Sequence, residues 1–134
     1  MTLNEIRERV LFQTNNDLDD LGDFQPHIEG YINEGYDLLT MAYDRIHVNA
    51  EKNGDVKYPS LVNASDTPTL PEWMHPALAD FATYMIYRNG NALKQNRGMA
   101  FWQMFQLVLQ RARMREDETH YQRNLYVDMR TVRR

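Results

Sequence analysis

The stretch GMAFWQMFQLVLQRARMR, residues 98–115, combines two properties that seldom share one helix. Nine of the eleven residues from 99 to 109 are apolar, and only Gln103 and Gln106 interrupt the run. A helix that is apolar on nearly every side has to be buried on nearly every side. Three basic residues then follow at alternate positions, Arg111, Arg113 and Arg115. The stretch therefore predicts a central helix, and it raises the question of what the arginines contact.

The large apolar residues of this stretch are candidates for contact between copies of the chain, and Met104 and Leu107 add to their number. Burial of one such side chain contributes about 1.5–3 kcal/mol, so two or three per contact could sustain an oligomer. The helix could instead be simply the core of its own domain, and the sequence leaves both interpretations open. We take as subunit-interface candidates Phe101, Trp102, Phe105, Arg111, Arg113 and Arg115.

The composition is typical of one globular domain. The chain has 134 residues, of which 43% are hydrophobic and 25% are charged. The absence of cysteine excludes disulfides, thiolate metal sites and a cysteine nucleophile. The first residues, MTLNEIRERV, lack the apolar core of a signal peptide. The apolar run of residues 99–109 is shorter than the about 20 residues that cross a bilayer. We expect a soluble protein made inside the cell, with no membrane partner.

Charge is divided unevenly along the chain. Residues 1–72 hold 14 acidic and 5 basic side chains, a net charge of −9, whereas residues 73–134 hold 5 acidic and 10 basic, a net charge of +5. Six basic residues and no acidic one lie between Arg88 and Arg115. Such polarity suits either nucleic acid or head-to-tail contact between identical copies. A solvated helix face without a partner is the alternative.

Apolar periodicity predicts two helices in the first third of the chain. Thr2 and Glu5 form a T-x-x-E capping box, so the first helix should begin at Leu3 and fade near Thr14. The second should run over residues 24–47, with Asp23 as its N-cap. Gly35 lies on its apolar stripe and weakens the helix by about 1 kcal/mol relative to alanine. We therefore expect a close helix contact at this glycine.

The second half of the chain predicts two further helices and completes the fold class. The third should begin between Glu72 and Pro76, with His75 as a helix-start residue, and should reach about Asn89. The fourth should follow from about Asn91 and continue past residue 113. Two long helices with a short connection pack antiparallel. The sequence thus predicts an all-α protein, an antiparallel bundle of about four helices.

Two segments are not predicted to be helical. Residues 49–71 form a long connection rich in proline, for which a projecting loop or a short hairpin is expected. The tail YQRNLYVDMRTVRR, residues 121–134, alternates apolar and polar side chains, which is a strand signal. A lone edge strand could pair with another protein by strand addition, and a frayed terminus is the alternative. We divide the chain into a helical domain, residues 1–115, and an extended C-terminal tail, residues 116–134.

No catalytic or metal motif occurs in the sequence. The four histidines form no H-E-x-x-H or i, i+4 pair, and no phosphate-binding glycine loop or G-x-S-x-G elbow is present. The acidic stretch NNDLDDLGD resembles a calcium loop only in part. If Asp17 is position 1, Asp19 and Gly22 fit, but Ile28 occupies the position of the bidentate glutamate. We expect no enzymatic activity, no metal and no cofactor.

The order of segments DFQPHIEGYINEGYDLL, a long loop, LPEWMHPALADFATYMIYRNGN and an aromatic-rich helix resembles the head–tail connector proteins of tailed bacteriophages, also called adaptor or head-completion proteins. The resemblance covers roughly residues 3–113, and it is most specific from residue 70 to residue 88. It is a pattern of helix lengths and motifs without a catalytic signature.

The resemblance implies a structural virion protein that forms a ring, commonly twelvefold, under the portal vertex at the phage neck. Its partners would be itself, the portal protein and the next neck or tail-completion protein, with genomic DNA passing without tight binding. It would act in the virion and assemble in the host cytoplasm. Family C-termini often reach along the portal. The resemblance therefore implies these portal-docking candidates: Leu125, Tyr126, Val127, Asp128, Met129 and Arg130.

A small helical nucleic-acid-binding protein is the alternative function. Its phosphate contacts would come from the basic segment of residues 88–115, and its affinity would fall steeply with salt. The overall pI of about 5.5 speaks against it, as does the lack of a recognisable helix-turn-helix.

Overall fold

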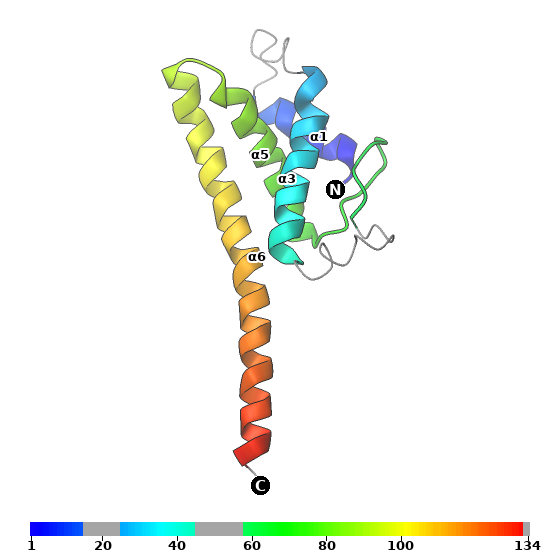
Figure 1. Ribbon diagram of the computed structural model, residues 1–134. Helices are drawn as coiled ribbons and strands as arrows, with labels where there is room; N and C mark the ends of the chain where they lie inside the picture. The colour runs from blue at the N-terminus through cyan, green and yellow to red at the C-terminus, as the bar shows by residue number, and fades with distance from the viewer. Residues whose placement is uncertain (15–24, 45–57, 133–134) are drawn as a thin grey trace.

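A computed structural model describes residues 1–14, 25–44 and 58–132, with side chains through residue 114. These residues form four α-helices and no strand (Figure 1). The predicted all-α fold of about four helices is therefore confirmed. The helices are listed in chain order as α1 Leu3–Gln13, α3 Ile28–Tyr43, α5 His75–Arg88 and α6 Ala92–Val132.

Helix α1 begins where the capping box predicts. The hydroxyl of Thr2 accepts a hydrogen bond from the backbone N–H of Glu5 at 3.2 Å, which satisfies one of the unpaired donors of the first turn. Leu3, Ile6 and Val10 are fully buried and pack α1 against α5 and α3. This burial stabilises a helix of 11 residues that would be marginal alone in water.

Helix α3 is shorter than the sequence predicts. A 3-10 turn, Gln25–His27, precedes it, because the ring of Pro26 disfavours the α conformation at the residue before it. The helix ends at Tyr43, and Asp44 leaves the helical conformation (φ −146°, ψ 67°); its carboxylate accepts a 2.8 Å hydrogen bond from the Tyr58 hydroxyl. The predicted N-cap Asp23 and residues 45–47 lie outside the described residues. So does the calcium-like stretch of residues 15–23.

The close contact expected at Gly35 is confirmed. A Cβ atom at this position would lie 2.9 Å from a ring carbon of Phe81 on α5. The missing side chain therefore lets α3 approach α5 more closely than any other residue would allow. Ile32, Tyr36 and Leu39 flank this contact and are buried in the core.

Helices α5 and α6 form an antiparallel hairpin with a short connection (Figure 1). A 3-10 turn, Glu72–Met74, leads into α5, and His75 begins the helix as expected. A ladder of ring contacts then runs in opposite directions along the two helices. From the connection inward, its pairs are Tyr87–Phe101 at 6.3 Å, Tyr84–Trp102 at 4.7 Å and Phe81–Phe105 at 4.9 Å between centroids.

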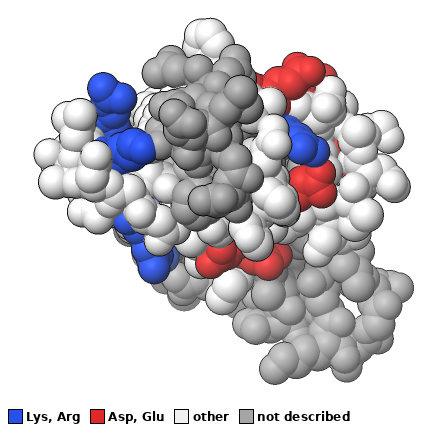
Figure 2. Space-filling view, turned by 90° about the horizontal axis from the view of Figure 1, so that it is seen from above, with Lys and Arg blue, Asp and Glu red and all other residues white. Residues whose placement is uncertain are grey.

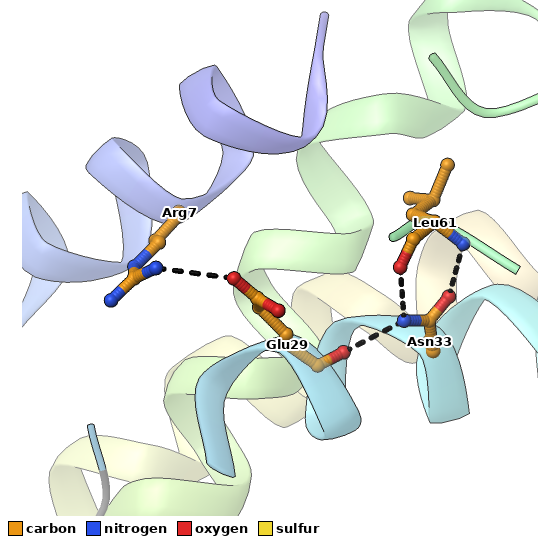
Figure 3. A network of polar contacts seen from close by, with 4 residues as sticks. All are labelled: Arg7, Glu29, Asn33 and Leu61. Atoms are coloured by element: carbon orange, nitrogen blue, oxygen red, sulfur yellow. Dashed lines mark hydrogen bonds and ion pairs between the residues drawn. The ribbon is translucent and has the colours of Figure 1, made fainter. Parts of the chain in front are cut away.

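The described part of the long connection, residues 58–71, is docked on the helices. Asn33 of α3 holds it: its side-chain amide accepts from the N–H of Leu61 at 2.8 Å and donates to the carbonyl of Leu61 at 2.9 Å (Figure 3). The N–H groups of Leu3 and Asn4 reach carbonyls of the same segment. The expected loop is therefore confirmed for residues 58–71, where no strand forms, and these contacts hold it against α1 and α3; residues 49–57 lie outside the described part.

The C-terminal tail extends away from the body of the molecule, but as a helix and not as a strand. Helix α6 continues to Val132, and its last buried residue with a described side chain is Ala112 (Figure 1). The 20 residues that follow Ala112 span about 30 Å at the helical rise. The strand predicted for residues 121–134 is wrong for residues 121–132, which are helical because no glycine or proline follows Gly98 to interrupt the helix. Residues 133–134 lie outside the described part.

Candidate interaction surfaces on helix α6

The inner face of α6 contains the aromatic residues that the sequence offered as interface candidates. Phe105 is fully buried, with its ring 4.9 Å from Phe81 and 5.9 Å from Trp102. Its assignment to a subunit interface is therefore corrected: it is a core residue and offers no surface. Phe101 and Trp102 are half-buried against α5, so only part of each ring is left for a partner.

The outer face of α6 is apolar and uncovered within the described residues. Its residues follow at alternating steps of four and three, which is the spacing of a coiled-coil seam. All seven are exposed. We call this set the α6 outer face: Leu93, Arg97, Ala100, Met104, Leu107, Arg111 and Met114. The exposed fractions of its large apolar side chains are 61% for Leu93, 50% for Met104, 66% for Leu107 and 68% for Met114.

The three arginines of the opening stretch do not share one environment. The guanidinium of Arg111 lies 4.3 Å from the ring centroid of Trp73, a cation–π contact that fixes its position without using its N–H donors. Arg113 is exposed. The side chain of Arg115 lies outside the described part, as do those of the tail candidates Leu125 to Arg130. No sequence pattern predicts the contact between Arg111 and Trp73, which are 38 positions apart.

The division of charge along the sequence is also a division in space. Most basic side chains on this face lie on the side where α5 meets α6, and another lies beside acidic side chains on the opposite side (Figure 2). Arg88 and Arg97 are exposed at that corner, whereas the exposed carboxylates described in residues 1–72 belong to α1, to α3 and, for Glu72, to the turn before α5. The single ion pair among the described residues joins Arg7 and Glu29 at 3.1 Å, between α1 and α3 (Figure 3). The basic corner is thus separate from the acidic helices.

Buried polar side chains in the core form hydrogen bonds with one another. The Asp80 carboxylate accepts from the Gln13 amide at 2.9 Å, and the Gln13 oxygen accepts from the Thr83 hydroxyl at 2.6 Å. Burial raises the pKa of Asp80, while Gln13 and the charge of Arg9 act in the opposite direction. Among the described residues, every buried side-chain nitrogen or oxygen has a hydrogen-bond partner. This network therefore leaves no free polar atom in the core to meet a ligand.

His75 is a buried histidine with both ring nitrogens engaged. Its Nε2 lies 2.8 Å from the carbonyl of Leu70, which only accepts, so Nε2 carries the proton. Its Nδ1 then accepts from the amino group of Met1 at 2.9 Å. Burial lowers the pKa of His75, and the Leu70 carbonyl partly offsets this. The ring joins the start of α1 to the start of α5.

No group of three or more histidine, cysteine, aspartate or glutamate side chains in the described part of the chain could hold a metal ion. No helix there is long and apolar enough to cross a membrane. No protein-family model, no curated protein and no solved structure matches this chain. The exposed surfaces of α6 are the candidate interaction sites of the described residues.

Proposed function

We propose that this protein is a structural component of a phage neck, a head–tail connector that assembles with its own copies and with a portal protein. The observation that carries the proposal is α6, which continues about 30 Å beyond its last described buried residue. Most helical stability in proteins comes from tertiary packing, so a second surface that packs against this segment, such as the portal, would stabilise it.

Three further features support an assembly role. The α6 outer face exposes four large apolar side chains in one row, and such patches mark interaction sites. Residues 1–72 carry a net charge of −9 and residues 73–134 a net charge of +5, and such polarity suits a head-to-tail contact between copies. The resemblance of residues 3–113 to connector proteins points to the same class. On this proposal the protein forms a ring, twelvefold as is common among connector proteins. The ring extends the DNA channel, and the next neck protein binds to it.

The proposal is tested by mixing the protein with the portal of the phage that encodes it and imaging the mixture by negative-stain electron microscopy. The full chain should add a ring of density to the portal. A chain that ends at residue 120 should keep its folded body but lose this density, because the docking candidates Leu125 to Arg130 are removed. Density that persists in the truncated protein would contradict the role of the tail, and a full chain that never binds a portal would contradict the proposed function.

Nucleic-acid binding remains the second candidate, because one observation favours it. Arg88, Lys94 and Arg97 lie close in sequence at the α5–α6 corner, and no acidic residue intervenes. If these side chains bind phosphates, the logarithm of the binding constant should fall by about 0.9 per contact for each tenfold rise in salt. Replacing Arg88 and Arg97 by glutamine should then weaken binding to duplex DNA. Unchanged affinity in that variant would exclude the corner as a DNA site.

A further inference from the structure

The α6 outer face has a counterpart on α3. Exposed residues of α3 and its preceding turn recur at steps of three and four, at positions 27, 30, 34, 38 and 41, and Asp37 is exposed beside this row. Leu38 is 40% exposed and Met41 is 54% exposed, and two carboxylates lie beside them. We call this set the α3 outer face: His27, Gly30, Glu34, Asp37, Leu38 and Met41.

Gly30 is the residue of this face whose lack of a side chain is not explained by packing among the described residues. A Cβ atom added at Gly30 would meet nothing within 4 Å, whereas at Gly35 and Gly98 it would lie 2.9 Å from Phe81 and Tyr87. Glycine is a poor helix former, so an open position is better served by alanine. A glycine on an exposed helix face lets the backbone of another helix approach closely.

Charge decides which partner suits the α6 outer face. If this face paired with itself across a twofold axis, Arg97 and Arg111 of both copies would lie in one desolvated seam, and like charges there are unfavourable. The α3 outer face offers Glu34 and Asp37 instead. Arginine pairs well with carboxylates, and the stacked guanidinium of Arg111 keeps its N–H donors for such a bond.

We propose that the α6 outer face of one copy binds the α3 outer face of the next copy. Leu38 and Met41 pack against the row that contains Met104 and Leu107, and carboxylates of α3 meet arginines of α6. The contact is heterologous, because two different patches meet, so it propagates into a ring if the rotation closes. This inference rests on the proposed function and deepens it, since it names the two surfaces that build the ring.

Two charge-neutral double variants test the contact. Leu38→Gln with Met41→Gln disables the α3 outer face, and Met104→Gln with Leu107→Gln disables the α6 outer face. Glutamine is a good helix former, so both variants should fold, which far-UV circular dichroism checks. Phe12→Gln with Val62→Gln is the matched control, because these side chains are 78% and 71% exposed and lie on neither face.

Sedimentation velocity gives the readout, at up to about 100 μM protein, where a contact with a Kd of about 10 μM is largely formed. Wild type and control should form species larger than a dimer. Each double variant alone should be monomeric. An equal mixture of the two should form one-to-one dimers and nothing larger, because each variant keeps the face that the other has lost.

Three results would overturn the contact. The first is a wild-type protein that stays monomeric throughout. The second is self-association of the Leu38→Gln, Met41→Gln variant alone, which would indicate pairing between α6 faces. The third is a mixture that stays monomeric. Failure of the proposed function is a separate result: rings that form in solution but never join a portal refute the neck role, while a monomer that still joins a portal refutes only this contact.

Discussion

Replacing Phe105 by alanine should cost far more folding free energy than replacing its neighbour Met104, because the two side chains leave α6 on different faces. Phe105 is fully buried and contacts the rings of Phe81 and Trp102. Truncation of such a phenylalanine costs about 3–5 kcal/mol, through lost burial and the cavity that remains. Met104 is half-exposed. Its replacement in a dilute, monomeric sample should change stability by no more than about 0.5 kcal/mol, as is usual for surface positions.

Urea unfolding followed by far-UV circular dichroism measures both effects. With a slope of about 2 kcal/mol per molar urea, the Phe105→Ala midpoint should fall by about 1.5–2.5 M, and the Met104→Ala midpoint should hardly move. The experiment has to be done at low protein concentration, because association stabilises the folded state by mass action. If the two variants shifted the midpoint equally, our assignment of the inner and outer faces of α6 would be wrong. A loss below about 1 kcal/mol for Phe105→Ala would show that this ring is not part of a well-packed core.

Three further substitutions test the packing of the body. Asn33→Ala should lower the unfolding free energy by about 1–3 kcal/mol and speed hydrogen exchange of the Leu61 amide, because both backbone groups of that residue lose their partner; unchanged exchange would contradict the anchor. Burial raises the pKa of Asp80, so its stabilising contribution is present below pH 3.8 and is lost as the pH rises through the raised value. Asp80→Asn, which keeps an acceptor for Gln13, should therefore remove this pH dependence in urea unfolding between pH 4 and 7. A variant whose stability depends on pH as the wild type does would contradict the raised pKa of Asp80. Gly35→Ala should destabilise the protein despite the better helix propensity of alanine, because its Cβ atom would lie 2.9 Å from the facing phenylalanine ring; a gain in the midpoint would refute the close contact.

Local signals in the sequence were enough to predict the helices. The capping box of Thr2 and Glu5 located the start of α1, and the apolar stripe with Gly35 predicted both α3 and its tight contact. These features act within a few residues, so the sequence displays them directly. The ends of α3 were misjudged at both sides. The hydrogen bond that Asp44 accepts at the end of α3 comes from Tyr58, a partner 14 positions away that no periodicity reveals.

The faces of α6 could not be told apart from the sequence. Apolar residues surround the helix between residues 99 and 109, so composition does not indicate which side is buried. The choice depends on α5, whose Tyr87 fits against Gly98 and whose Phe81 meets Phe105. These contacts turn Met104 and Leu107 outward. Phe105 was therefore a mistaken choice for a surface, while a row at steps of four and three was the signal that could have located the outer face.

The sequence at the end of α6 is compatible with both a strand and a helix. Leu125, Val127 and Met129 alternate with polar residues, but an alternation over so few positions also occurs on a helix that has more than one apolar side. The helix continues because the chain enters this segment already helical, and extending an existing helix is far easier than starting one. A partner that binds residues 116–132 would therefore meet a segment that is already helical, and the entropic cost of ordering it would be small. This is the physical reason for proposing the portal contact at this end of the molecule and the contact between copies on the body.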